Sequence, residues 1–185
     1  MKRLTEGLAW AKRLENERGG ALIEMAMCLP FLCLLVFGVI EFSRIILDCQ
    51  VMNGMSRQGS DLASRGWPLA DEGATPGVLT ALVTQGAPLN IGTQGRIIVT
   101  EVTYDPNGNP TIADQVPSSS GITVTSRIGS GVGNAPNATL MPVNTTLAKQ
   151  TVFVTEVFYS YSPFTPLGSF FSGSIGSTLY DVAYF

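Results

Sequence analysis

The longest apolar stretch of the chain lies near its N-terminus and contains a single charged side chain. Between Gly19 and Ile40, Glu24 is the only residue expected to carry a charge at neutral pH. As a helix, these 22 residues would reach about 33 Å, which is enough to cross a bilayer. A carboxylate about one turn inside the hydrocarbon costs roughly 2.5 to 3.5 kcal/mol on insertion scales. Glu24 is therefore a candidate functional residue.

A second interpretation places Glu24 at the membrane surface, where its carboxylate reaches headgroup water. The span is then Met25–Ile40, which has 16 residues and falls slightly below the usual range of roughly 17 to 25. Residue spacing alone leaves both interpretations open.

Basic residues flank the apolar stretch unequally. Five of them precede it, namely Lys2, Arg3, Lys12, Arg13 and Arg18, and those that follow are thinly spread. This bias predicts a cytoplasmic N-terminus and a C-terminal part outside. A secretory signal would need a small-x-small cleavage site after the apolar core, and Phe37–Arg44 provides none. We expect a single-pass protein of the inner (cytoplasmic) membrane.

Apolar and small residues continue at helical spacing beyond the membrane stretch. They are Ile45, Ile46, Cys49, Met52, Met55, Gly59, Leu62 and Ala63. Charged residues alternate with them, and Arg57 and Asp61 have the spacing of a helical ion pair. Gly66-Trp67-Pro68 ends the pattern, because the residue before proline avoids helical geometry. The pattern predicts an amphipathic continuation of the membrane helix. The result is one long helix, half in lipid and half covering a soluble domain.

The remaining 120 residues suffice for one small domain and carry mainly β signals. Segments rich in β-branched and aromatic residues are Arg96–Tyr104, Gly121–Ser126, Thr151–Tyr161 and Ser177–Phe185. They predict an antiparallel sheet. Ile45, Ile46, Met52 and Leu62 are expected to cover the sheet residues Val99, Val102, Val154 and Val157. Thr75–Gln85 is predicted to be a short helix, with Thr75 as its capping residue.

Two loop segments remain, and the first of them is a candidate calcium-binding loop. Asp105–Pro110 offers oxygen ligands at alternate positions, but Pro110 replaces the glycine of an EF-hand loop and Val116 its final glutamate. A hairpin turn at Asn107-Gly108 explains this segment better. Gly129–Thr146 is rich in turn-forming residues and is expected to be a long surface loop.

Composition narrows the function classes. Without residues 1–19, which hold five of the 11 basic and three of the 14 acidic residues, six basic and 11 acidic residues remain and the net charge is −5. This balance argues against nucleic-acid binding. The chain has no histidine, and none of its three cysteines lies in the β-rich part. We therefore expect no enzyme activity, no cofactor and no metal site.

The stretch Arg18–Arg44 resembles the N-terminal signature of TadE-like proteins, which are minor pilins or pseudopilins of the Tad (tight adherence) branch of type IV pilus systems. In that family a basic leader ends in glycine and a glutamate stands fifth after the cut. A proline interrupts the apolar run, and a Gly-x-x-Glu-Phe-x-Arg-like exit follows. Met25 departs from the pattern, because an aromatic residue is usual there, and Ser43 stands where a second glycine is common.

The resemblance implies cleavage by a prepilin peptidase between Gly19 and Gly20, which makes Glu24 the fifth mature residue. It implies that Glu24 neutralises the new ammonium group at Gly20 during pilus assembly, on its own or a neighbouring chain. The chain then comprises a cytoplasmic leader (1–19), a transmembrane and amphipathic helix (20–65) and an extracytoplasmic β-rich domain (66–185).

The implied fold is α+β and pilin-like, with a long N-terminal helix on a small antiparallel sheet. The implied partners are the membrane, the prepilin peptidase, other Tad pilins and inner-membrane assembly proteins. The implied role is assembly of a pilus for surface adhesion, with incorporation into the filament left open. The rival interpretation is an unprocessed, membrane-tethered β-domain that binds a ligand or partner in the cell envelope.

Overall fold

The computed structural model describes the backbone of residues 2–165 and 178–185, and side chains from residue 19 onward. The chain divides into two compact units. The first contains α1 as far as Ser43 with Pro163 to Thr165, and the second contains Arg44–Ser162 and the C-terminal strand. The side chains of the predicted leader, and Ser177 of the fourth predicted strand, lie outside the described residues.

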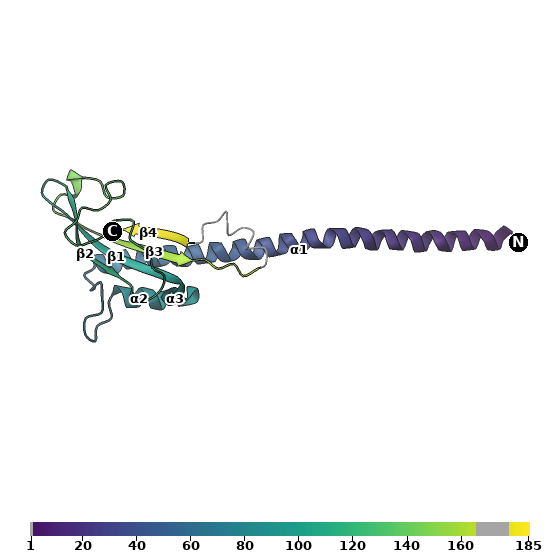
Figure 1. The fold of residues 1–185 in the computed structure, drawn as a ribbon, viewed down its shortest axis with the longest axis horizontal. Coiled ribbons are helices and arrows are strands. Elements are labelled where there is room, and N and C mark those ends of the chain that lie inside the picture. The colour runs from purple at the N-terminus through teal and green to yellow at the C-terminus, as the bar shows by residue number, and fades with distance from the viewer. Residues whose placement is uncertain (1, 166–177) are drawn as a thin grey trace. The chain divides into compact units, whose positions relative to one another are not determined.

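Helix α1 spans Lys2–Ser64 and continues through Pro30 without interruption (Figure 1). It includes the region predicted as a leader, as well as the predicted helix. Gly66 ends it in a left-handed conformation, with φ of +84°, which glycine adopts at low cost. The predicted stop at Gly66-Trp67-Pro68 is confirmed.

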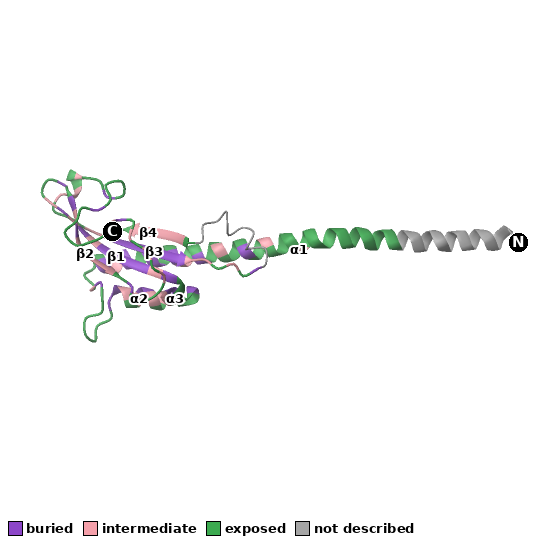
Figure 2. Ribbon diagram, viewed as in Figure 1, coloured by how far each residue is buried: buried purple, intermediate pink, exposed green. Residues whose placement is uncertain are grey.

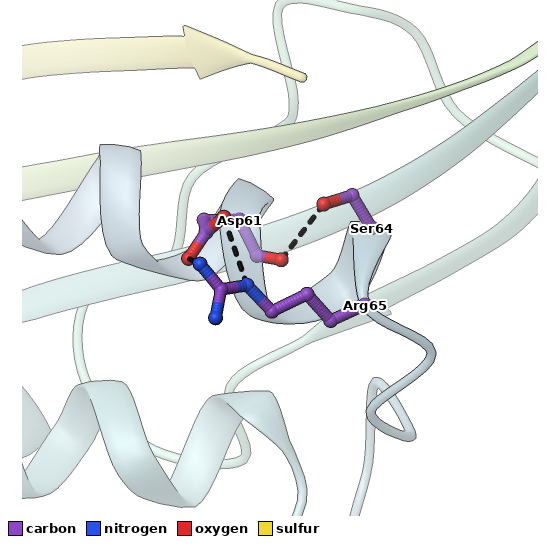
Figure 3. Close-up of polar contacts among 3 residues, drawn as sticks. All are labelled: Asp61, Ser64 and Arg65. Atoms are coloured by element: carbon purple, nitrogen blue, oxygen red, sulfur yellow. Dashed lines mark hydrogen bonds and ion pairs between the residues drawn. The ribbon is translucent and has the colours of Figure 1, made fainter.

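The helix ends with an ion pair that differs from the predicted one. Asp61 pairs with Arg65, at 2.9 Å between Oδ2 and Nη2, and Arg65 Nε donates to Asp61 Oδ1 at 3.1 Å (Figure 3). The Ser64 hydroxyl donates to the Asp61 carbonyl in the same turn. The predicted Arg57–Asp61 pair is wrong, because Arg65, one turn later, takes the carboxylate.

Within the described residues, the sheet has four antiparallel strands in the order β2-β1-β3-β4. They are β1 (Gly95–Tyr104), β2 (Pro110–Pro117), β3 (Thr151–Ser160) and β4 (Thr178–Tyr184). Pairing places Val99 opposite Thr155 and Glu156 opposite Val182. With the amphipathic half of α1 packed on this sheet, the α+β, pilin-like fold class is confirmed.

One face of the sheet packs on α1 and on α2 (Val78–Gln85). Met52 and Met55 of α1, Leu82 of α2, and Val99 and Val157 of the sheet share one buried cluster (Figure 2). Gly59 permits the close approach, because a Cβ there would lie 2.7 Å from both Leu82 Cδ1 and Thr155 Oγ1. The expected contribution of Ile46 is wrong, since its side chain is 56% exposed.

The opposite face carries a second cluster, and the helix does not reach it. Val102 and Val154 pack there with Ile128 and Met141 from the segment between β2 and β3. The prediction that both valines lie on the helix face is wrong, because strand residues alternate between faces. The Gly129–Thr146 segment has the expected loop structure, apart from the short helix η2 (Thr145–Leu147). It covers this face of the sheet.

Three local predictions have mixed outcomes. The predicted strand at Gly121–Ser126 is wrong, because this segment contains no strand and β2 lies earlier in the chain. Helix α2 begins after Gly77, whose N–H donates to the Asp71 carboxylate, so Thr75 is not its cap. The hairpin turn between β1 and β2 is confirmed: Gly108 has φ of +82°, and Asp105 accepts hydrogen bonds from the Asn107 and Asn109 amides.

Candidate processing site and anchoring helix

The predicted processing and assembly residues lie on consecutive turns of α1. Gly19, Gly20 and Glu24 are all exposed. A Cβ built at either glycine would meet nothing within 4 Å, so neither glycine is required by packing within the described residues. Gly20 and Glu24 are four residues apart and lie on the same face of the helix. That spacing allows the Glu24 carboxylate to neutralise an ammonium group formed at Gly20.

The helix surface after Glu24 is apolar and uncovered. Leu22, Phe31 and Leu35 are 67%, 71% and 65% exposed, respectively. Among the described residues, one helix is long and apolar enough to cross a membrane, and no part of its most apolar window is buried. Exposed apolar surface of this extent is costly in water, so a lipid environment accounts for it. Figure 2 shows the exposed stretch of α1 in green.

Glu41 lies directly after this apolar stretch and is 4% exposed. Its carboxylate accepts hydrogen bonds from the Phe164 N–H at 3.2 Å, the Thr165 N–H at 3.1 Å and the Thr165 hydroxyl at 2.9 Å. Glu41 therefore ties the chain that follows β3 to the helix. The sequence signal for Glu41 was its position in the Gly-x-x-Glu-Phe-x-Arg-like motif at the end of the apolar stretch. This motif does not reveal hydrogen-bond partners more than 120 residues away.

Glu156 in β3 is the second buried carboxylate that sequence reasoning missed. It is 0% exposed and accepts hydrogen bonds from the Ser126 hydroxyl, the Arg127 N–H at 2.8 Å and the Tyr180 hydroxyl at 3.1 Å. Burial, and then the charge of Glu156, raises the pKa of the Tyr180 phenol, so its hydroxyl stays protonated and donates. The Arg127 guanidinium stacks over the Tyr180 ring, 3.9 Å from its centroid.

This arrangement anchors a loop through the Glu156 carboxylate. Each oxygen of Glu156 is engaged by a donor from the Ser126–Arg127 segment or from β4. The carboxylate thereby holds the start of the covering loop against the second sheet face. Among the described residues, no group of three or more histidine, cysteine or acidic side chains is placed to hold a metal ion.

A long N-terminal helix with an uncovered apolar stretch, followed by a small antiparallel sheet, defines a pilin-like α+β protein with one candidate membrane helix. Residues 19–61 match the family model described as TadE-like protein. The family resemblance is thereby confirmed over the apolar stretch and most of the amphipathic segment. Comparison with curated proteins and with solved structures gives no significant match.

Proposed function

We propose that this protein is a minor pilin or pseudopilin that takes part in assembly of a Tad-type pilus for surface adhesion. The observation that carries the proposal is the TadE-like segment, in which Gly19-Gly20 precede an uncovered apolar helix with Glu24 at its start. In this proposal the leader lies on the cytoplasmic side of the inner membrane, and the sheet domain lies on the opposite side. The protein acts as a substrate of a prepilin peptidase and as an assembly partner of other pilins and inner-membrane proteins. It is not an enzyme.

Processing gives the direct test of this proposal. Co-expression with a prepilin peptidase should yield a chain that begins at Gly20, measured by intact mass or N-terminal sequencing of membrane-extracted protein. Gly19→Leu should block the cut, because a branched side chain crowds the protease site. Gly38→Leu is the matched control, since a Cβ at Gly38 also meets nothing within 4 Å, and it should leave cleavage unchanged. Recovery of only the uncut wild-type chain would refute the processing site.

Substitution of Glu24 separates assembly from cleavage. Glu24→Gln keeps shape and polarity but removes the charge that neutralises the ammonium at Gly20, so the chain should be cleaved and inserted while piliation falls. Glu24→Asp keeps the charge and should retain more piliation than the glutamine variant. Counts of surface pili, with intact mass as the processing control, measure both effects. Normal piliation by Glu24→Gln would leave Glu24 as a residue at the membrane surface.

The alternative function is that of an unprocessed, membrane-tethered β-domain that binds a ligand or partner in the envelope. The compact second unit, which starts at Arg44 and contains the whole described sheet, is the observation that favours it. Both functions use the same anchor, so they differ in whether the chain is cut before Gly20. An uncut chain in native membranes that contain an active prepilin peptidase supports the tethered domain.

A further inference from the structure

Lys149 is the one lysine of the chain after Gly19, and its backbone has a conformation that is unusual for this residue type. Its φ is +64°, and among the described residues Asn90 is the one other non-glycine residue with a positive φ. Such values are uncommon for residues other than glycine and asparagine, and strained residues cluster at ligand-binding sites. The conformation of Lys149 indicates a position at which the direction of the side chain matters.

Backbone hydrogen bonds hold Lys149 in place just before β3. Its N–H donates to the Tyr104 carbonyl at 3.0 Å, and the Tyr104 N–H donates to the Gln150 carbonyl at 2.9 Å. Leu147, two residues earlier, packs against the second cluster, on the sheet face opposite α1 and α2. Lys149 is exposed, and no described residue forms an ion pair with it. The backbone thus presents an ammonium group on that side of the sheet.

A groove lies on the other side of the sheet, between α2 and the segment that follows β2 (Figure 1). It has a volume of about 440 Å³, and every residue that lines it belongs to the described part of the chain. Its apolar lining consists of Ala70, Leu79, Val83, Val116 and Pro117, and its polar lining of Asp71, Thr80, Thr84, Ser118, Ser119 and Ser120. The groove therefore combines apolar surface with hydroxyl groups and one carboxylate.

The threonines and the carboxylate of this groove are arranged to accept hydrogen bonds. The Thr84 hydroxyl donates to the Thr80 carbonyl, and the Thr80 hydroxyl donates to the Asp71 carboxylate, both at 2.9 Å. Each hydroxyl has thereby used its one proton and meets a ligand as an acceptor. The Gly77 N–H, which donates to Asp71 at 2.7 Å, and then the Thr80 hydroxyl lower the pKa of Asp71, so its carboxylate stays charged.

A lysine side chain has the chemistry that this groove accepts. Its methylene stem covers apolar surface while its ammonium group donates to oxygen acceptors. Each oxygen of the Asp71 carboxylate already accepts one hydrogen bond. A compact ammonium group therefore suits the site better than a guanidinium group, which prefers to engage both oxygens of a carboxylate at once. Lys149 of a second copy matches the groove in charge and in shape.

Two copies anchored in one membrane can make this contact with their α1 helices parallel. β4 runs in the direction of α1, because Ser56 bonds to Asp181 and the next turn of α1 bonds two residues further along β4. β3 is antiparallel to β4, so Lys149, just before β3, lies at the end of the sheet where α1 ends. Asp71, seven residues after that helix end, lies there too. Since the two residues lie on opposite faces of the sheet, neither copy needs to be turned over.

We propose that the Lys149 side chain of one copy of this protein inserts into the groove between α2 and Ser118–Ser120 of a neighbouring copy, where its ammonium group pairs with Asp71. The two contacting surfaces are different, so each copy offers both a lysine and a groove, and the contact repeats from copy to copy. The inference goes beyond the proposed function, because it requires that the copies share one membrane and does not require cleavage before Gly20.

Carbodiimide coupling in membranes of cells that produce the full-length protein tests this proposal. The reagent joins a carboxylate and an amine that are in contact as an amide, and mass spectrometry of the coupled dimer should identify a Lys149–Asp71 linkage. Thr84→Trp fills the groove but retains Asp71, and it should reduce this linkage by about tenfold or more. Ala87→Trp, at an exposed position outside the groove, is the matched control and should retain the linkage.

Exchange of the two charges shows whether the contact joins two copies. Asp71→Lys and Lys149→Glu should each abolish the coupled dimer when produced alone. Produced together they should restore it, because Lys149 of the first variant meets Asp71 of the second. Thermal melts of the detergent-extracted variants show whether each keeps its fold. If Asp71→Lys lowers the melting temperature through loss of the bonds to Gly77 and Thr80, Thr84→Trp decides the result.

Three results would overturn the proposal: no Lys149–Asp71 linkage in the wild type, a linkage that Thr84→Trp leaves unchanged, or folded charge-exchange variants that do not restore coupling when mixed. Coupling of Lys149 to a different protein in place of Asp71 would also overturn it. Intact mass of the same samples tests the proposed function separately, because an uncut chain that still forms the linkage refutes processing and leaves this contact in place.

Discussion

A fragment that begins at Arg44 should fold in water without detergent, whereas a fragment that begins at Ala70 should not. The first keeps the amphipathic part of α1, with Met52 and Met55 at 1% and 0% exposure, and lacks the uncovered apolar stretch. The second loses that helix and exposes Val99 and Val157 beneath it. Exposure of a few hundred Å² at about 25 cal/mol per Å² offsets most of the marginal stability of a small domain.

Circular dichroism and thermal melts of the two fragments measure the difference. Within the longer fragment, Met55→Ala should cost roughly 2 to 5 kcal/mol of unfolding free energy, because it leaves a cavity in the core. Ile46→Ala is the matched control on the exposed side of the same helix, and it should stay within about 0.5 kcal/mol of wild type. Equal and cooperative melting of the fragments from Arg44 and Ala70 would contradict the role of α1 as the cover of the sheet.

Glu156→Leu should destabilise the sheet domain by about 3 kcal/mol or more. The leucine leaves the Ser126 hydroxyl, the Arg127 N–H and the Tyr180 hydroxyl without their acceptor. These hydrogen bonds are part-buried, so each unpaired donor costs about 1 kcal/mol or more, near the low end of the range for buried groups. For a domain of this size the melting temperature should fall by about 10 °C. Glu156→Gln should cost less, about 1 kcal/mol, because its amide oxygen still accepts and its amide nitrogen can donate to Ser126.

Glu101→Gln is the control for this experiment. Val99–Val102 of β1 and Val154–Val157 of β3 share the sequence Val-Thr-Glu-Val, and Glu101, which has the position of Glu156 in that sequence, is half-buried. It should change the unfolding free energy by no more than about 0.5 kcal/mol. Urea unfolding of the fragment that begins at Arg44 provides the measurement. A stability for Glu156→Leu equal to that of Glu101→Gln would show that the Ser126–Arg127 segment is held by other contacts.

Local signals predicted most of the elements. The apolar stretch from Gly19 and the stop at Gly66 depend on neighbouring residues. Helix α1 contains the apolar stretch and ends at Ser64, just before Gly66. Strands β1, β3 and β4 were predicted from their β-branched and aromatic residues. β2 was missed because its two prolines, Asp114 and Gln115 carry a weak strand signal. Its strand conformation comes from pairing with β1 instead.

Gly121–Ser126 shows the opposite error, because it was predicted as a strand and does not form one. Its composition favours a strand, but β2 already pairs with β1 on that side. Within the segment, the Ile122 N–H donates to the Gly95 carbonyl at 3.0 Å. Gly121 passes so close to the same carbonyl that a Cβ would lie 1.7 Å from it. Competition for the edge of β1 decided which segment became the strand.

The sequence by itself determined the candidate membrane helix, the Gly19-Gly20 and Glu24 pattern, the family resemblance and three of the four strands, because each depends on residues close together in the chain. Tertiary structure alone decided which face of the sheet each valine joins and where the Glu41 and Glu156 carboxylates find their donors. These features depend on strand register and on contacts between residues from about 30 to more than 120 positions apart. Such contacts form only when the chain closes its long loops, so they cannot be predicted from the pattern of neighbouring residues.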